Sequence, residues 1–212
     1  TTPEMATACA VAFCERIDAG ERIAEVRRTT KETDIYIRLN LDGSGTCKIN
    51  TGLGFFDHML EAFAVHSGFD LTLNMTGDLQ VDCHHSIEDA GIVLGQAFSK
   101  VLGDKSSIAR YGSFFIPMDE TLAFCAVDIS GRPFLVFDCA FTNQSVGAFD
   151  CCMTGEFFRA LAFGAGMTLH LRVLYGENDH HRIEALFKAA AHALKEAVVP
   201  RDGGVLSSKG VL

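Results

Sequence analysis

Two pairs of adjacent histidines could carry chemistry in this chain, because each pair is followed three residues later by a glutamate. The first set is His84, His85 and Glu88, and the second is His180, His181 and Glu184. The same step of 96 residues relates the members of the two sets. Three coinciding offsets are hard to attribute to chance, so we interpret the sets as two copies of one motif.

Imidazole and carboxylate groups at this spacing favour metal binding. Both copies run into apolar stretches with helical spacing, which predicts that each motif lies at a helix N-terminus. On a helix each histidine shares a face with the glutamate three or four residues later. Adjacent histidines point about 100° apart, so each pair is expected to serve two metal ions rather than one. The glutamates and the absence of a Cys-x-x-Cys pair favour Mn or Fe over a structural zinc site.

Two other interpretations of these residues remain open. Polar groups are common at the start of a helix, where acidic side chains complement the helix dipole. Cys83, next to His84, could be a thiolate ligand, but the second copy has Asp179 at that position.

The composition limits the class of protein. The chain has 212 residues, 48% of them hydrophobic, and a formal net charge of −9. This charge argues against a general nucleic-acid surface but leaves room for a small phosphate ester. No apolar run approaches the roughly 20 residues of a membrane span. The eight cysteines follow no disulfide spacing, which indicates a reducing compartment.

The elements that must position the histidines follow one order twice. The sequence predicts strands at 34–41, 70–76, 79–83, 120–130, 133–140 and 167–174, and helices at 54–66, 155–164 and from each motif to about 102 and 198. This order predicts an α+β fold made of an internally duplicated unit, with two four-stranded mixed sheets that each carry helices on one face. We divide the chain into an N-terminal extension or tag remnant (1–20), two repeat halves (21–110 and 111–200) and a C-terminal tail (201–212). One open sheet face per half predicts self-association.

The motifs, taken together, resemble those of imidazoleglycerol-phosphate dehydratases. The matching segments cover the chain in order from about residue 22 to its end: Arg28–Thr33, Gly54–Leu60, Gly77–Leu79, Asp82–Asp89, Pro117–Glu120, Asp128–Pro133, Thr168–His170, Gly176–His181 and Ser207–Leu212.

This resemblance implies a hydro-lyase of histidine biosynthesis that converts imidazole glycerol phosphate to imidazole acetol phosphate. It also implies two Mn²⁺ per active site, twenty-four identical subunits with active sites between chains, and a location in the cytoplasm, or in the plastid of a plant. Carried over position by position, the metal ligands are His58, His84, His85, Glu88, Glu156, His180, His181 and Glu184. The phosphate-binding residues are Arg110, Arg132, Lys188, Ser207 and Lys209, and Glu32 contacts a substrate hydroxyl.

Three residues depart from the family pattern. Glu156 stands where the family version has a histidine, and a carboxylate remains a suitable Mn ligand. Cys83 stands where a second aspartate commonly precedes the histidines, so an acidic partner of the ligands is missing there. Ala62 stands where some members have a glutamine that contacts the phosphate.

The reaction requires that a proton leave a carbon that has no carbonyl next to it. The substrate's own imidazole, bound to Mn as imidazolate, can supply this acidity. We favour Glu184 as the base, with Glu88 as the alternative, and Glu32 as the group that orients or protonates the departing hydroxyl. A binuclear metallohydrolase acting on a small phosphate ester is the main competing function, and a metal-storage protein would lack the phosphate-binding cluster.

Overall fold

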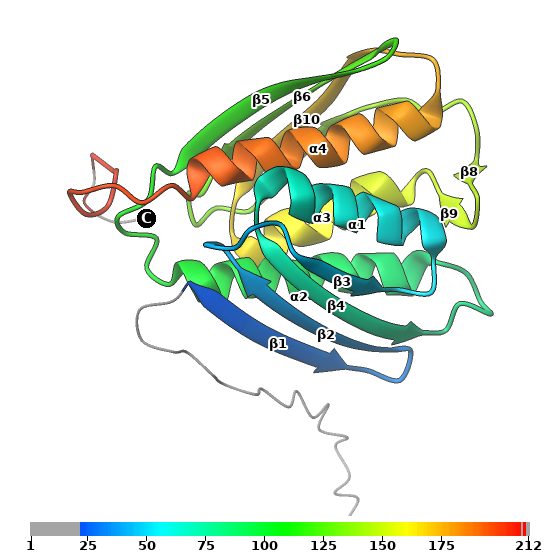
Figure 1. Ribbon diagram of the computed structural model, residues 1–212, viewed down its shortest axis with the longest axis horizontal. Coiled ribbons are helices and arrows are strands. Elements are labelled where there is room, and N and C mark those ends of the chain that lie inside the picture. The colour runs from blue at the N-terminus through cyan, green and yellow to red at the C-terminus, as the bar shows by residue number, and fades with distance from the viewer. Residues whose placement is uncertain (1–21, 209, 211–212) are drawn as a thin grey trace, which may run out of the picture.

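The computed structural model describes residues 22–208 and 210, and it places a layer of helices between two β-sheets (Figure 1). The strands are β1 (Ile23–Thr29), β2 (Thr33–Asn40), β3 (Cys47–Asn50), β4 (Asp70–Gly77), β5 (Tyr111–Met118), β6 (Thr121–Asp128), β7 (Phe134–Asp138), β8 (Ser145–Val146), β9 (Phe149–Asp150) and β10 (Thr168–Tyr175). The helices are α1 (Gly54–Ser67), α2 (His84–Leu102), α3 (Met153–Ala165) and α4 (Asp179–Ala197).

The two large sheets have the same topology. Sheet 1 has the strand order β1-β2-β4-β3 and sheet 2 has the order β5-β6-β10-β7. In each sheet the first three strands pair antiparallel and the last pairs parallel to its neighbour. The predicted α+β fold, with two four-stranded mixed sheets and helices on one face of each, is therefore confirmed.

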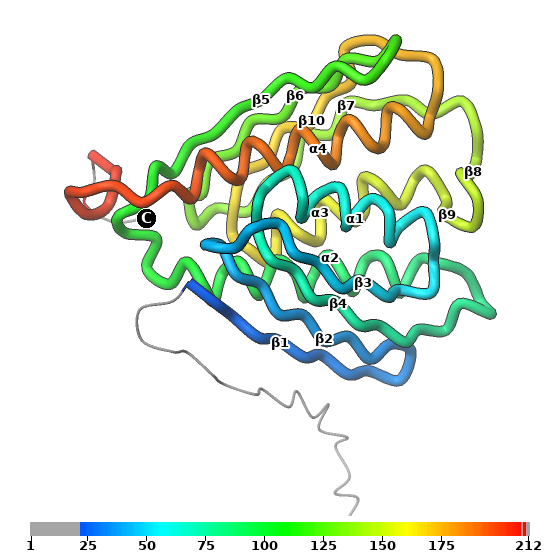
Figure 2. The backbone as a smooth tube through the Cα atoms, in the orientation of Figure 1, coloured from blue at the N-terminus to red at the C-terminus, as the bar shows by residue number. Residues whose placement is uncertain are grey.

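Alternation along the central strands explains which sheet face the helices cover. In β2 and β6 every second residue is buried, so one face of each sheet turns towards the helices. A core of aliphatic residues and phenylalanines fills the space between, and Phe56, Phe157, Phe158 and Phe187 are fully buried there. The tube view shows α1 beside α4 and α3 beside α2 (Figure 2). Each helix pair thus joins one element from each half of the chain.

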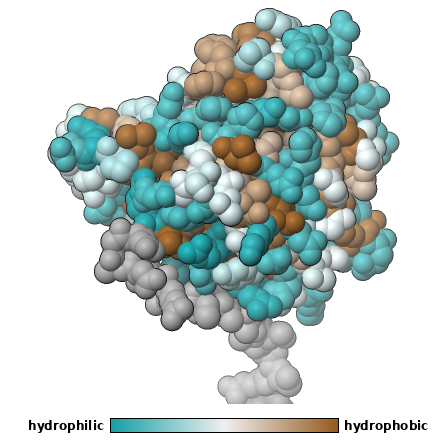
Figure 3. Space-filling model, in the orientation of Figure 1, coloured by the Kyte–Doolittle hydropathy of each residue, from teal (hydrophilic) through white to brown (hydrophobic). Residues whose placement is uncertain are grey.

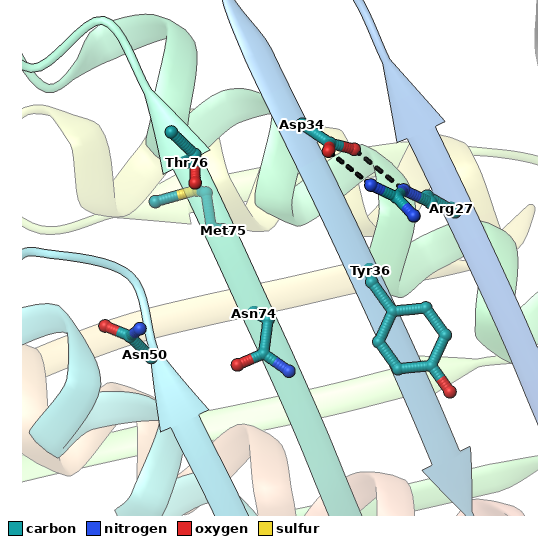
Figure 4. Close-up of a pocket in the computed structure, with 7 residues that line it drawn as sticks. All are labelled: Arg27, Asp34, Tyr36, Asn50, Asn74, Met75 and Thr76. Carbon is teal, nitrogen blue, oxygen red and sulfur yellow. Dashed lines mark hydrogen bonds and ion pairs between the residues drawn. The ribbon is translucent and has the colours of Figure 1, made fainter.

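The outer faces of the two sheets differ in polarity. Sheet 2 exposes Tyr111, Phe115, Phe134 and other large apolar side chains. Figure 3 shows apolar surface along the upper edge of the molecule, where this sheet lies in Figure 1. Sheet 1 carries polar residues on its outer face. A hollow of about 340 Å³ in that face is lined mainly by polar side chains, including the ion-paired Arg27 and Asp34 (Figure 4).

Two details differ from the sequence prediction. The prediction of a strand at 79–83 is wrong. This segment forms a turn, in which the Val81 N–H donates to the Asp78 carbonyl (2.8 Å), and it then leads into α2. The edge strands β1 and β5 were not predicted, since β5 contains Pro117 and has apolar residues on both faces, which hides its alternation. Residues 1–20, the predicted extension, lie outside the described residues. In the described part of the chain no helix is long and apolar enough to cross a membrane.

Candidate active site

All four helices begin at the same end of the molecule, on the right in Figure 1. The motif residues lie in the first turns of α2 and α4, and His58 and Glu156 lie near the starts of α1 and α3. The packing of α1 on α4 and of α3 on α2 therefore sorts the predicted ligands into two groups. Each group draws residues from both halves of the chain.

Equivalent residues bind the backbone at the starts of α2 and α4, although in α2 this residue lies one position before the N-cap, Cys83. The Asp82 side chain accepts a hydrogen bond from the backbone N–H of His84 (2.8 Å), and the Asn178 side chain accepts one from His180 (2.9 Å). Asp82 and Asn178 are related by the same step of 96 residues as the histidines. These caps fix where each motif helix begins, and hence which way its histidines point.

The first donor group consists of His58, His180 and Glu184. One potential ligand atom from each residue lies within 4.8 Å of the other two. Glu184 Oε2 is 3.4 Å from His58 Nε2 and 3.1 Å from His180 Nε2. The other oxygen of Glu184, Oε1, pairs with Lys188 Nζ at 2.7 Å. The structure therefore directs one oxygen towards the imidazoles and anchors the other on a cation.

The Glu184 carboxylate is ionised in spite of its burial. The side chain is 8% exposed, and burial alone would raise its pKa. The hydrogen bond from Lys188, together with the nearby His58 and His180, outweighs burial and places the pKa below its ordinary value. A buried, ionised carboxylate beside two imidazole nitrogens is a ligand set that suits a divalent metal.

The second donor group contains His84, Glu88 and Glu156, and Arg159 lies between its carboxylates. Glu88 Oε2 is 3.7 Å from His84 Nε2, and Glu88 Oε1 is 3.2 Å from Arg159 Nη2. Arg159 Nε also donates to Glu156 Oε2 at 2.8 Å. The ligand atoms of this group do not all lie within 4.8 Å of one another, as those of the first group do.

The second histidine of each pair points to a different carboxylate. Asp78 Oδ2 lies 2.9 Å from His85 Nδ1, and Glu120 Oε2 lies 2.7 Å from His181 Nδ1. Backbone N–H groups of Asn178 and Glu177 and the contact with His181 hold the pKa of Glu120 well below its usual range. A carboxylate on Nδ1 fixes the ring orientation and leaves Nε2 for a metal ligand. Neither His85 nor His181 belongs to the first or second donor group.

Glu32 reaches the same end of the molecule through an anchored hairpin. Its carboxylate is 4.0 Å from His85 Nδ1. The β1–β2 turn that carries Glu32 is tied to α2, because Asp89 Oδ2 accepts from Thr33 Oγ1 and pairs with Arg28 Nη1, both at 2.5 Å. Asp89 follows Glu88 directly, so α2 positions both a predicted ligand and the hairpin.

The predicted phosphate-binding residues do not all come together. Arg110 binds Asp128 through Nε (2.6 Å) and Nη2 (3.1 Å), and its Nη1 donates to the Leu206 carbonyl (2.5 Å), next to Ser207. The exposed Arg132 faces the same Asp128 at 3.7 Å. Lys188 instead pairs with Glu184 of the first donor group, and Lys209 lies outside the described residues.

The sequence interpretation gave no role to four residues that organise these groups. Asp78 and Glu120 orient the outer histidines, Asp128 gathers the two arginines, and Arg159 bridges Glu88 and Glu156. Asp78, Glu120 and Asp128 stand inside the segments that carry the family resemblance, so motif matching marked their positions but not their functions. No sequence pattern indicated a role for Arg159, since its contact with Glu88 depends on the packing of α3 against α2.

Comparison with known proteins agrees with this arrangement. A family model described as imidazoleglycerol-phosphate dehydratase matches residues 51–194. The chain is 57% identical, over 204 residues, to an imidazoleglycerol-phosphate dehydratase of Symbiobacterium thermophilum, which covers 94% of this chain and 98% of that protein. It is 56% identical over 193 residues to the corresponding protein of Lacticaseibacillus casei, with 90% and 100% covered.

Solved structures show the same fold. The imidazoleglycerol-phosphate dehydratase of Staphylococcus aureus N315 aligns with a TM-score of 0.76 and 43% identity, over 84% of this chain and 99% of that chain. The Pyrococcus furiosus protein, solved in complex with (S)-C348, aligns with a TM-score of 0.78 and 39% identity, over 88% and 100%. With its duplicated fold, its helix-start histidines and its near full-length relatives, this chain belongs to the imidazoleglycerol-phosphate dehydratase family.

Proposed function

We propose that this chain converts D-erythro-imidazole glycerol phosphate to imidazole acetol phosphate with two Mn²⁺ per active site. Its family is a family of hydro-lyases that act in histidine biosynthesis. The observation that carries the proposal is the group of His58, His180 and Glu184, whose ligand atoms lie within 4.8 Å of one another. Nitrogen and carboxylate donors in this number suit Mn²⁺.

The proposed metal ligands are those of both donor groups and the two outer histidines. They are His58, His84, His85, Glu88, Glu156, His180, His181 and Glu184. When bound, the manganese ions would stabilise the imidazolate form of the substrate ring, which would help the C3 hydroxyl to leave and so make the C2 hydrogen acidic. His85 and His181 lie apart from both groups, so we assign their Nε2 atoms to ions held mainly by another copy of the chain.

The protein itself must move one proton and guide the departing hydroxyl. We assign Glu184 as the base that takes the C2 proton, because its carboxylate is buried and ionised, and Lys188 fixes its position. Glu88, its counterpart in α2, is the alternative base. Glu32 would orient or protonate the hydroxyl that leaves C3, and the resulting enol would then form the ketone.

The phosphate is assigned to Arg110, Arg132, Ser207 and Lys209, with Lys188 on the side of the metal ions. The tail formed by residues 201–212 would be the substrate-binding segment, while residues 21–110 and 111–200 would be the two repeat halves. Guanidinium and ammonium groups with a hydroxyl donor suit a phosphate dianion. Asp128 would hold the guanidinium of Arg110 in place for that contact.

One chain cannot supply all of these contacts to one substrate molecule. The backbone N–H of Arg110 donates to the Ala197 carbonyl at the end of α4, whereas His180 lies at its start. Seventeen residues of helix separate these positions by about 25 Å. A three-carbon chain separates ring and phosphate by less than about 10 Å, given bond lengths near 1.5 Å. This distance supports active sites between chains, in an assembly that we propose to contain twenty-four copies.

Metal analysis combined with an ultraviolet assay of ketone formation tests the function. Mn-reconstituted protein should hold two Mn²⁺ per chain and form the enol-derived ketone from imidazole glycerol phosphate without releasing phosphate. Release of inorganic phosphate would instead identify a binuclear metallohydrolase. One metal per chain in fully active enzyme would contradict the two-ion centre.

A further inference from the structure

Arg159 is the cation of the second donor group, and no motif of the sequence assigned it a role. It lies on α3, one turn after Glu156, and its side chain is half exposed. Its guanidinium contacts Glu156 Oε2 through Nε and Nη2, and Glu88 Oε1 through Nη2. It therefore links the carboxylate of α3 to the carboxylate of α2.

The internal duplication allows the two donor groups to be compared position by position. Helices α1 and α3 both end at a left-handed glycine, Gly68 (φ 77°) and Gly166 (φ 65°). His58 and Glu156 each stand ten residues before that glycine. The imidazole of the first group is thus replaced by a second carboxylate in the other group.

The carboxylates of both groups share one arrangement. Glu184 places Oε1 on Lys188 (2.7 Å) and directs Oε2 towards imidazole nitrogens. Glu88 places Oε1 on Arg159 (3.2 Å) and directs Oε2 towards His84 (3.7 Å). The position in α2 equivalent to Lys188 is Ile92, which cannot supply a charge. The second group therefore takes its cation from α3 instead of from its own motif helix.

The negative charges of Glu88 and Glu156 explain why this group needs the guanidinium of Arg159. Two carboxylates that must face one metal ion repel each other, and an opposite charge between them offsets that repulsion. The double contact of Arg159 with Glu156 Oε2 leaves Oε1 of that residue as its ligand atom. Arg159 is thereby suited to a group that has two carboxylates and one imidazole rather than one carboxylate and two imidazoles.

We infer that Arg159 is a positioning residue of the second donor group, which holds one oxygen of Glu88 and one of Glu156 so that the other oxygen of each faces the metal ion. It performs for this group the task that Lys188 performs for Glu184. This inference rests on the proposed two-metal function. It assigns Arg159 no contact with the substrate.

Manganese titration of the full-length protein tests the inference. Electron paramagnetic resonance of free Mn²⁺ would give the affinities of the two equivalents in the parent protein and in the variants R159Q and R159K. R159Q should lower the affinity for one of the two Mn²⁺ equivalents by roughly 10-fold or more, as expected when a residue that orients a ligand is removed. R159K should recover part of that loss, because an ammonium group still pairs with both carboxylates.

A matched control comes from the outer face of sheet 1. Arg27 forms an exposed ion pair with Asp34 on the face of sheet 1 that is turned away from the helices, so R27Q should bind manganese like the parent protein. Excess Mn²⁺ should restore the turnover of R159Q, since the variant lacks affinity rather than a catalytic group. A purely structural role would not give this recovery.

Three results would overturn the role of Arg159. R159Q could bind both equivalents of Mn²⁺ with the affinity of the parent protein, or it could lose affinity for both equally and also melt at a lower temperature. The third result is that R159K binds Mn²⁺ no better than R159Q. Failure of the proposed function would appear in the parent protein itself, as fewer than two bound Mn²⁺ or no ketone formation. The two failures are therefore distinguishable.

Discussion

At the scale of single residues, the site depends on carboxylates whose two oxygens perform different tasks. Glu184 and Glu88 each place one oxygen near imidazole nitrogens and the other on a cation. Asp78 and Glu120 in turn hold the Nδ1 atoms of the outer histidines. A side chain anchored at one atom has little freedom at the next, which is what a ligand or a base requires.

Substitution of Glu184 by glutamine tests the proposed base. The amide keeps the size of the side chain and one acceptor oxygen but cannot take a proton, so kcat should fall by about 100-fold or more. The measurement must pair kinetics with metal content, because an amide is a weaker Mn ligand. Exchange of the substrate C2 hydrogen with deuterated solvent should be lost as well. Near-normal turnover at full Mn occupancy would move the role to Glu88 or Glu32.

At the scale of elements, the helix contacts decide the geometry of the donor groups. Helices α2 and α3 approach closely because glycines face each other's backbone: a Cβ on Gly95 would lie 2.6 Å from the Leu161 carbonyl oxygen and 2.8 Å from Gly164 Cα. Such contacts are too short for a side chain. The close approach is what lets Arg159 of α3 reach Glu88 of α2.

Gly95→Ala should therefore push α3 away from α2. We expect the free energy of unfolding to fall by roughly 1–3 kcal/mol, the usual cost of overpacking. Gly54→Ala, at the start of α1, is the matched control, since a Cβ there meets no atom within 4 Å. Denaturant unfolding of both variants provides the comparison. Equal stability of the two variants would show that the α2–α3 contact can relax without cost.

The contact between α1 and α4 contains a pair of histidines that should make stability depend on pH. His66 Nδ1 and His192 Nε2 are 3.2 Å apart, and the His192 ring stacks on Phe114. Burial lowers the pKa of both histidines from the ordinary value of 6.5. The charges of Lys188 and His192 lower the pKa of His66 further, and Glu184 opposes them. The charge of Lys195 lowers the pKa of His192 further, and Glu196 opposes it.

A lowered pKa means that the folded protein favours the neutral imidazoles. Their contribution to stability is complete above the unfolded pKa near 6.5 and is lost as the pH falls from there through the folded pKa. The free energy of unfolding should thus decrease between about pH 7.5 and 5.5, and His192→Gln should reduce that decrease. His170→Gln, an exposed histidine of β10, serves as control. An unchanged slope in His192→Gln would exclude the pair as the cause.

At the scale of the whole molecule, the outer faces of the two sheets indicate how copies meet. The outer face of sheet 2 exposes Tyr111 (52%), Phe115 (55%) and Phe134 (58%), whereas polar residues dominate that of sheet 1. Exposed apolar patches mark interaction surfaces. The proposed assembly, whose active sites would lie between chains, would bury such a surface.

Phe115→Glu should therefore reduce the size of the assembly in solution. A charge placed in an apolar contact is costly unless it is paired. Thr72→Glu on the outer face of sheet 1 is the control, and mass photometry gives the mass of each variant. Loss of assembly should also abolish ketone formation, since the proposed site needs more than one chain. An unchanged mass would mean that copies associate through another face.

The sequence by itself determined the duplication, the start of each motif helix and the family. The step of 96 residues, the apolar helical spacing after each motif, and the imidazole and carboxylate groups are local features, and local features can be read from residue type and spacing. The α+β class, with two four-stranded mixed sheets, followed from the order of elements that repeats. The edge strands β1 and β5 were not predicted, because solvent or a partner surface, rather than the core, determines which residues stand on one of their faces.

Only the tertiary structure decided which predicted residues meet. His58 joins His180 and Glu184 because α1 packs on α4, and Arg159 reaches Glu88 because α3 packs on α2. Both contacts join residues far apart in the chain, and such pairs depend on core packing that spacing along the sequence does not encode. The same packing placed Lys188 with the proposed metal ligands and left Arg110 about 25 Å of helix away from His180, which is why the proposed site draws on a second chain.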